Sequence, residues 1–423
     1  MMEKEYLRRT VDEELNAILE SSGAVLIEGP KWCGKTRTAQ ERAASAIYLQ
    51  DIDKQSYYQH MLDTKPSALL EGETPRLIDE WQVAPVLWNG VRFLVDQRCK
   101  AGQFILTGSV VQAPDKKLHT GTGRIARLLM RPMTLFESNE SDGSVSLRSL
   151  FNGDDVGGVS PLTVEGLAFA LVRGGWPASM GEERVPALRH AREYVKAVRN
   201  TDISSVDGVE RDPDCVDRLM RSLARNVSTT AKLTTIRDDM AAGDPEAAPS
   251  MVTVRSYMNA LRRLFVIEDQ PAWLFSKRSK TAARTSPKRH FVDPSIATAA
   301  LQMSPEGLLN DFNTFGLLFE SLCVRDLRAY AQANDGYVYH YRDKNGLEVD
   351  AVVELLDGRW GAVEVKMSER GIDEAAANLA RFREKVDTGR MGQPSFLMVV
   401  TATEHAYRRR DGVLVVPIGC LRE

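Results

Sequence analysis

Apolar residues recur every three or four positions between residues 4 and 21, which predicts an amphipathic helix. A continuous apolar run at 24–28 follows and predicts a short buried strand. Similar runs at 76–80 and 103–107 predict two more strands, with a helix over 86–97 between them. Strands that alternate with helices are typical of an α/β fold with a mostly parallel sheet.

The pattern changes twice further along the chain. A polar, glycine-rich stretch at 138–160 predicts a boundary between domains. Helical patterns follow, and those between 213 and 275 end in the apolar pair Val266-Ile267, an order that suggests a winged helix-turn-helix. From about residue 336 onward, β-rich segments flank one helix at 373–385. We therefore expect three domains, at 1–140, 160–290 and 291–423.

Composition narrows the class of protein. The 423 residues are 43% hydrophobic and 27% charged, which excludes a fibrous or wholly disordered chain. The net charge of -3 argues against a nucleic-acid coat or a membrane-surface protein. No apolar run is long enough for a membrane span, the amino terminus lacks the apolar stretch of a signal peptide, and the five cysteines include no C-x-x-C pair. A cytoplasmic protein without a disulfide frame, a zinc site or a membrane partner is expected.

The first predicted strand runs directly into a phosphate-binding loop. The pattern G-x-x-x-x-G-K-[ST] is met by Gly29, Gly34, Lys35 and Thr36. Glycines let backbone N–H groups surround phosphate oxygens, Lys35 would neutralise phosphate charge, and Thr36 would offer its hydroxyl to Mg²⁺. The residues predicted to bind ATP here are Gly29, Pro30, Lys31, Trp32, Cys33, Gly34, Lys35 and Thr36.

Two acids end the second predicted strand. Asp79 is expected to hold Mg²⁺ through water, and Glu80 to orient or deprotonate the water that attacks the γ-phosphate. An acid pair after a strand also occurs as a plain solvated turn, but the loop upstream favours the functional interpretation. Thr107 and Ser109, at the end of the third strand, are placed to sense the γ-phosphate.

An arginine is expected to complete the ATP site. Arg124 follows Gly121-Thr122-Gly123 and could reach a phosphate in its own subunit or in a neighbour's, so oligomerisation stays open. Arg127 and Arg131 compete for this role, and a plain surface arginine is the alternative. Cys33 is interpreted as a spacer in the loop, with a redox-sensitive thiol as the alternative.

In the order GPKWCGKT, LIDEWQ, FILTGS, GTGR and RPMTLFE, the chain from residue 6 to about 137 resembles the AAA-type ATPase domain of bacterial and archaeal ATP-binding proteins. These carry a carboxy-terminal domain of unknown function that resembles PD-(D/E)xK nucleases, and segments GGWP, TVRSY and FVDP are similar to their middle region. The resemblance implies ATP binding and hydrolysis. It also implies an α/β fold with an amino-terminal P-loop parallel-sheet domain, a helical and winged-helix middle, and a carboxy-terminal α+β PD-(D/E)xK-like domain.

The carboxy-terminal region carries its own acidic cluster. Asp350 is followed by Glu364-Val365-Lys366, and Glu320 lies on a predicted helix upstream. A metal-dependent nuclease needs carboxylates to hold Mg²⁺ beside the scissile phosphate and a lysine to activate water. Asp350 and Glu364 are therefore candidate ligands of a second metal, with Glu320 and Lys366 in support. Surface charges on an inactive scaffold are the alternative.

Strand register gives this hypothesis a test. A two-residue turn would set Asp350 opposite Val365, whereas a three-residue loop with Gly358 in the left-handed conformation would set Asp350 opposite Glu364. We predict the second arrangement. An Asp350 that points away from Glu364 would contradict the nuclease hypothesis.

The remaining partner candidate is DNA. Six basic residues and no acid lie between residues 277 and 290, which suits phosphate contacts, although a solvated loop is the alternative. The leading hypothesis is an ATPase that uses Mg²⁺ to drive or gate its carboxy-terminal region. The alternatives are an ATP-regulated, Mg²⁺-dependent DNA nuclease and a non-catalytic, ATP-gated regulator that binds DNA or protein.

Overall fold

The computed structural model describes residues 5–110, 121–241, 248–274 and 286–423, and it forms two compact units. The first unit contains the chain up to Pro132 together with the short segments 204–209 and 263–265. The second unit contains the rest, up to Glu423. Within the described ranges, no helix is both long enough and apolar enough to cross a membrane.

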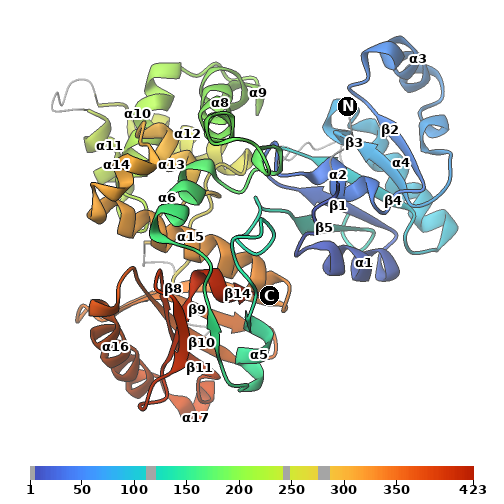
Figure 1. Cartoon of the computed structure of the whole chain (residues 1–423). Helices are drawn as coiled ribbons and strands as arrows, with labels where there is room; N and C mark the ends of the chain where they lie inside the picture. The colour runs from blue at the N-terminus through green and yellow to red at the C-terminus, as the bar shows by residue number, and fades with distance from the viewer. Residues whose placement is uncertain (1–4, 111–120, 242–247, 275–285) are drawn as a thin grey trace. The chain divides into compact units, whose positions relative to one another are not determined.

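The first unit is built on a five-stranded sheet in which all neighbours are parallel, in the order β2-β3-β4-β1-β5 (Figure 1). The strands are β1 (Ala24–Glu28), β2 (Ser45–Tyr48), β3 (Arg76–Asp79), β4 (Phe104–Gly108) and β5 (Ile125–Leu129). The helices are α1 (Asp12–Ser21), α2 (Lys35–Gln40), α3 (Gln55–Thr64) and α4 (Val86–Arg98). Strands β3, β4 and β1 are parallel neighbours, so the residues that follow each of them lie at the same edge of the sheet.

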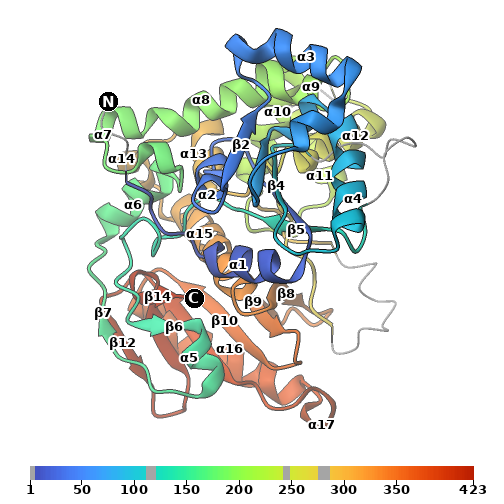
Figure 2. The same ribbon diagram turned by 90° about the vertical axis from the view of Figure 1, so that its right-hand side faces the viewer.

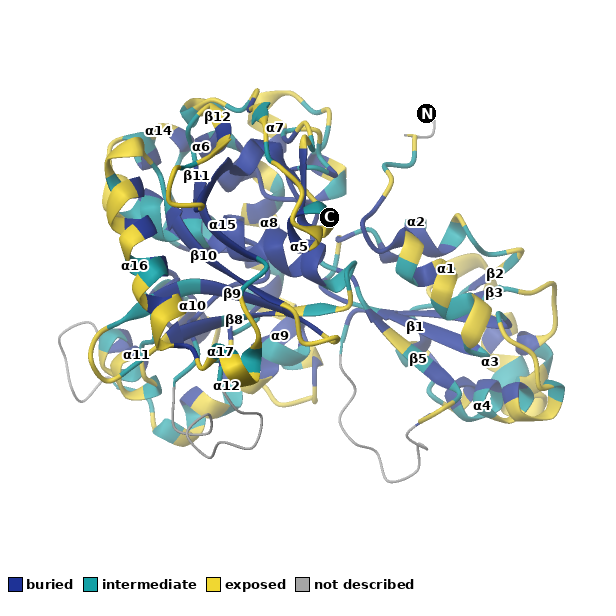
Figure 3. Cartoon of the chain, turned by 90° about the horizontal axis from the view of Figure 1, so that it is seen from below, coloured by how far each residue is buried: buried dark blue, intermediate teal, exposed yellow. Residues whose placement is uncertain are grey.

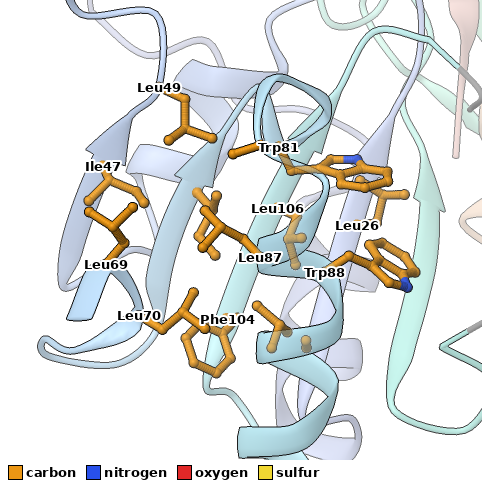
Figure 4. Close-up of a cluster of buried hydrophobic side chains, with 14 of the residues drawn as sticks. Leu26, Ile47, Leu49, Leu69, Leu70, Trp81, Leu87, Trp88, Phe104 and Leu106 are labelled. Carbon is orange, nitrogen blue, oxygen red and sulfur yellow. The ribbon is translucent and has the colours of Figure 1, made fainter. Parts of the chain in front are cut away.

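Buried apolar side chains hold helices against both faces of this sheet. On one face, Leu26 and Leu106 pack with Trp81 and Trp88, whose ring centroids are 4.7 Å apart (Figure 4). On the other face, alternate residues of the same strands, such as Ile27, pack with residues of α1 and α2. Parallel strands that are covered on both faces need continuous apolar sequence. The apolar runs of these strands could therefore be recognised as strands in the sequence.

One strand of the first unit was not expected. The residues from Arg37 to Ala46 are compatible with a helix in sequence, but α2 ends at Gln40 and Ser45–Tyr48 forms β2. This edge strand pairs with β3, where Ser45 lies opposite Arg76. Ile47 and Tyr48 favour a strand, and the edge of β3 supplies the partner with which the strand pairs.

The second unit contains a seven-stranded mixed sheet in the order β7-β12-β13-β11-β10-β9-β8 and a separate β14-β6 pair. Its strands are β6 (Val145–Ser146), β7 (Gly158–Val159), β8 (Gly336–Arg342), β9 (Glu348–Leu355), β10 (Trp360–Lys366), β11 (Phe396–Thr401), β12 (His405–Arg408), β13 (Leu414–Pro417) and β14 (Leu421–Arg422). The helices from α5 onward are α5 (Leu147–Asn152), α6 (Val164–Arg173), α7 (Arg184–Ala187), α8 (Arg189–Ala197), α9 (Ile203–Ser205), α10 (Pro213–Arg225), α11 (Leu233–Met240), α12 (Met251–Arg263), α13 (Pro294–Ala300), α14 (Pro305–Leu309), α15 (Phe312–Gln332), α16 (Ile372–Lys385) and α17 (Thr388–Met391).

Helix α16 covers one face of this sheet. It corresponds to the helix predicted at 373–385. Its residues Leu379 and Phe382 pack on Trp360 and Ala362 of β10. The strands β9, β10 and β11 are buried along most of their length, while α16 exposes its outer side (Figure 3). Helix α15 packs against β8, β9 and β10.

The polar stretch at 138–160 is not a simple linker. Within it, β6 pairs with β14 at the carboxy terminus, beside α5 (Figure 2), and β7 pairs with β12. The Ser141 hydroxyl also donates to the carbonyl of Leu421 at 2.7 Å. Glycine-rich sequence predicted a boundary, but distant strands recruit this segment into the second unit.

The segments GGWP and FVDP meet in a buried network. The backbone N–H of Gly175 donates to Asp293 Oδ2 at 3.0 Å, and the Trp176 indole donates to the Ser295 hydroxyl at 3.0 Å. Arg325 of α15 donates to the same Asp293 oxygen at 2.8 Å. Both motifs therefore have a structural role, because they fix α13 and α15 to the chain that follows α6.

Helices α10, α11 and α12 are followed by two antiparallel segments. Ile267 bridges Phe291, and Gln270 exchanges both backbone hydrogen bonds with Lys288, at 2.9 and 3.0 Å. This element order is compatible with the expected winged helix, which stays a prediction. DNA binding by this segment remains a prediction.

Candidate functional site

The loop after β1 has the backbone conformation that its glycines permit. Gly34 has a φ of 103° and Gly29 a φ of 156°. A Cβ at Gly29 would lie 2.1 Å from the Met130 carbonyl oxygen, so no larger residue fits there without a shift. Close packing of the loop on the chain after β5 therefore requires this glycine.

The Lys35 ammonium lies inside this loop. It donates to the carbonyls of Gly29 at 3.0 Å and Pro30 at 2.7 Å, and the residue is only 5% exposed. The ammonium is therefore held against the backbone of the loop. The role of Lys35 in neutralising phosphate charge stays a prediction.

Arg9 is buried and binds the backbone of the loop, and no sequence motif indicated this role. Its guanidinium donates to the carbonyl of Cys33 at 2.7 Å and to that of Arg131 at 2.8 Å. Cys33 itself has no exposed surface, and its thiol donates to the Met130 carbonyl. The alternative of a redox-sensitive Cys33 is wrong for this conformation, since solvent does not reach the sulfur. Trp32, by contrast, is 47% exposed.

A single carboxylate oxygen joins the loop to the acid pair. Asp79 Oδ1 accepts a hydrogen bond from the Thr36 hydroxyl at 2.7 Å and another from the Thr107 hydroxyl at 2.7 Å. Strand β4 supplies Thr107 between β1 and β3, as the sheet order requires. Thr36 and Asp79 thus present adjacent oxygen atoms, the ligand type that Mg²⁺ prefers, and they fit a magnesium site.

Glu80 is held in a strained conformation beside Asp79. Its φ of 55° is rare for a residue with a side chain, and its N–H donates to the Thr107 hydroxyl at 2.9 Å. The carboxylate accepts from the Ser109 hydroxyl at 3.2 Å and from the Gln82 amide. The sequence analysis did not predict a role for Gln82. Its position two residues after Glu80 is the signal that could have indicated one.

Arg124 does not lie with these residues. It precedes β5, whose first residue pairs with Ala24 at the start of β1, whereas the loop follows the end of β1. The two ends of a five-residue strand are about 13 Å apart. The Arg124 guanidinium instead binds Asp96 at 2.8 Å. An action of Arg124 on the ATP of its own subunit is therefore contradicted, and an action on a neighbour remains a prediction.

The position of Arg131 differs from that of Arg124. It follows β5 at the same sheet edge as the loop, and its carbonyl accepts from Arg9. Arg127 lies within β5 and binds Glu28 at 2.7 Å. Of the three arginines considered, Arg131 is the one at the correct edge.

The predicted register of the carboxy-terminal hairpin is confirmed. Strands β9 and β10 pair Glu354 with Trp360 and Ala351 with Val363, which sets Asp350 next in line opposite Glu364. Three residues form the loop, and Gly358 has a φ of 90°.

A β-bulge modifies this arrangement at Asp350. Tyr339 pairs with Val352 and Tyr341 with Val349, so two residues of β9 stand opposite one residue of β8. Asp350 Oδ2 accepts from the N–H of Val365 at 3.0 Å. Asp350 Oδ1 accepts from the Lys288 ammonium at 3.0 Å, while Glu364 Oε1 accepts from Asn378 of α16 at 2.8 Å. The two acids are neighbours on paired strands, but different groups hold each of them.

A buried lysine stands between two of the acids. The Lys288 ammonium donates to Glu320 Oε1 at 2.7 Å and to Asp350 Oδ1 at 3.0 Å. Burial opposes the charge of Lys288, but the two carboxylates outweigh it and raise the Lys288 pKa. Burial likewise opposes the ionisation of Asp350, yet Lys288 and the Val365 N–H hold its pKa below the ordinary value.

Lys288 and its neighbour correct the interpretation of the basic segment at 277–290. Lys288 is 4% exposed, and Arg289, at 6%, binds Asp269 at 2.7 Å. Neither side chain forms part of a surface patch for DNA. The other four basic residues of the segment, Lys277, Arg278, Lys280 and Arg284, lie outside the described residues.

The second metal site does not fit this geometry. In the part of the chain that the structure describes, no group of three or more His, Cys, Asp or Glu side chains is arranged to hold a metal ion. Lys288 occupies the space between Glu320 and Asp350, and Lys366 lies 3.4 Å from Glu364. The carboxylates predicted as metal ligands are therefore each paired with an ammonium or an amide.

Glu364 predicts a measurable pH dependence. Burial and then the charge of Asp350 raise its pKa from 4.5 to about 8, so the folded protein keeps a proton that the unfolded chain loses. Stability from this group is therefore lost as pH rises from about 4.5 to about 8. Between pH 6.5 and 8 the melting temperature should fall, and it should fall less in Glu364→Gln. Glutamine stays neutral and keeps an oxygen for Asn378.

Part of the slope should persist in Glu364→Gln, because burial and Asp350 also raise the pKa of Glu320 to about 8. The exposed Glu384→Gln variant is the matched control and should melt like the parent at each pH. Thermal melts followed by circular dichroism would measure this. Equal slopes in the parent and Glu364→Gln would contradict the assignment.

The parallel sheet, the glycine loop and the acid pair at one edge define a P-loop nucleotide-binding domain. In agreement, residues 21–139 match a family model described as an AAA domain, so the first unit is AAA-like. Residues 164–307 and 315–421 match models described as domains of unknown function (DUF8612 and DUF4143). No curated protein matches significantly. Among solved structures, a chain of "Structure of Drosophila ORC bound to DNA" is 16% identical, with a TM-score of 0.20 over 69% of this chain and 85% of that chain.

Proposed function

We propose that this protein is an AAA-type ATPase that binds ATP with Mg²⁺ at the loop after β1 and hydrolyses it. One observation carries the proposal: the oxygen Asp79 Oδ1 accepts hydrogen bonds from the hydroxyls of Thr36 on the loop and Thr107 on β4. This contact joins the phosphate loop to the acid pair, so the groups needed for binding and for hydrolysis lie at one place.

Each residue then has a separate task. The loop N–H groups and Lys35 would bind the phosphates, and Thr36 with Asp79 would hold Mg²⁺. Mg²⁺ neutralises charge on the β- and γ-phosphates when it is bound. Glu80 would orient a water molecule in line with the γ-phosphate and accept its proton, while ADP leaves with the bridging oxygen. Ser109 and Gln82 would set the position of the Glu80 carboxylate.

Turnover should require magnesium, since Asp79 and Thr36 offer only oxygen ligands. Phosphate release from ATP should be lost in excess chelator and should return when Mg²⁺ is added in excess. Arg124→Ala removes a charge at the opposite sheet edge and should keep turnover within about twofold of the parent in dilute solution, since an exposed ion pair contributes little. Turnover that persists in chelator would overturn the proposal, and a large loss in Arg124→Ala would assign Arg124 to a neighbour's site.

We propose further that hydrolysis drives or gates the second unit, through its winged-helix candidate and its carboxy-terminal sheet. The non-catalytic regulator, with DNA or a protein as partner, is supported by the order of α10, α11, α12 and the paired segments after them. It would bind ATP without turnover. The nuclease alternative has the hairpin register in its favour, but the Lys288 ammonium between Glu320 and Asp350 argues against its metal site. Magnesium-dependent DNA cleavage that is lost in Glu364→Ala would support it.

A further inference from the structure

The cluster around Lys288 is assembled from three distant segments. Lys288 comes from the paired segment after α12, Glu320 from α15 and Asp350 from the bulge of β9. The side chains are 5%, 14% and 15% exposed, respectively. Glu320 and Asp350 line a pocket of about 710 Å³, so this buried cluster lies at the wall of a cavity.

Gln270 fixes the position from which Lys288 extends. Its backbone exchanges two hydrogen bonds with Lys288, and its side-chain amide donates to the carbonyls of Asp350 and Tyr339, each at 3.0 Å. The lysine and the bulge are thus tied to the same residue. Gln270 therefore fixes the backbone from which the Lys288 side chain reaches the two carboxyl groups.

The ammonium fills the position that a shared metal ion would need. A divalent cation between Glu320 and Asp350 would lie about 2.0 to 2.6 Å from one oxygen of each. Lys288 Nζ is 2.7 and 3.0 Å from these same oxygens. The second oxygen of Asp350 is engaged by the Val365 N–H.

We infer that Lys288 is a tethered cation that takes the place of a divalent metal between Glu320 and Asp350, so the carboxy-terminal site is metal-free. The lysine places its positive charge beside both carboxyl groups from within the chain, and it does so at all metal concentrations. The pocket beside the cluster then offers its other polar side chains without a metal ion; these are Asn313, Lys366, Ser368 and Arg370. This inference concerns the second unit and does not depend on ATP hydrolysis in the first.

The test measures Mn²⁺ binding to the full-length, nucleotide-free protein by isothermal titration calorimetry. The proteins compared are the parent, Asp350→Asn, Lys288→Met and the double variant Lys288→Met with Asp350→Asn. The parent and Asp350→Asn should bind Mn²⁺ alike. Lys288→Met should gain a site at least about tenfold tighter than any parental one, and the added Asp350→Asn change should remove it.

Two results would overturn the inference. One is Mn²⁺ binding to the parent that Asp350→Asn abolishes, because the site would then accept a metal despite Lys288. The other is a folded Lys288→Met protein that gains no site. If Lys288→Met does not fold, Lys288→Gln replaces it, and the comparison of the parent with Asp350→Asn decides the question in either case.

Discussion

Lys35→Ala is expected to reduce ATP turnover at least about 100-fold, the scale at which one preorganised electrostatic stabiliser of a transition state acts. The ammonium lies in the loop within 3.0 Å of two backbone carbonyls, and alanine leaves no charge there for the γ-phosphate. ATP binding should weaken as well, because the ground state already carries phosphate charge. Phosphate release and binding of a fluorescent ATP analogue would measure the two effects.

Lys54→Ala is the matched control for this change. Lys54 lies in the same unit, pairs with Asp51 and has a side chain that is 59% exposed, so its loss should leave turnover at the parental rate. A folded Lys35→Ala protein as active as the parent would refute the ATP site.

Glu80→Gln is expected to reduce turnover by about 100-fold to 10,000-fold, the range of a lost general base. Glutamine has nearly the same shape, and its oxygen can still accept from Ser109, but it cannot take a proton from water. ATP binding should stay close to the parental level. Bound ATP should therefore persist on this variant, which single-turnover measurements with labelled ATP would detect.

Glu71→Gln provides the comparison, because Glu71 is an exposed acid before β3 with a side chain that is 64% exposed. If the parent itself binds ATP without turnover, this result supports the regulator hypothesis, because Glu80 then does not act as a general base. If Glu80→Gln hydrolyses ATP at the parental rate, another group acts as the base.

The sequence was sufficient to predict those parts of the site whose residues are adjacent in the chain. The strand, the glycine loop and Lys35 are adjacent in the chain, and the buried strand at 24–28 fixes where the loop begins. The hairpin register was also predictable, because a three-residue loop with a left-handed glycine allows one pairing of β9 with β10.

Only the tertiary structure decided which distant groups meet. The sequence predicts that Arg124 acts at the loop, but parallel pairing of β5 with β1 puts the two at opposite ends of β1. The segment at 138–160 reads as a linker, yet open strand edges far along the chain pair with it. These outcomes depend on sheet order, which local propensity does not encode.

The clearest case is Lys288. In the sequence it belongs to a run of basic residues, which predicts a solvated, phosphate-binding surface. In the fold its ammonium is buried between Glu320 and Asp350. The sequence by itself determined that this chain has a phosphate loop, an acid pair and a carboxy-terminal acidic hairpin. Tertiary structure decided which charge each acid faces. A buried carboxylate needs a paired charge or a hydrogen-bond donor, and the packing of distant segments determines which group lies beside it.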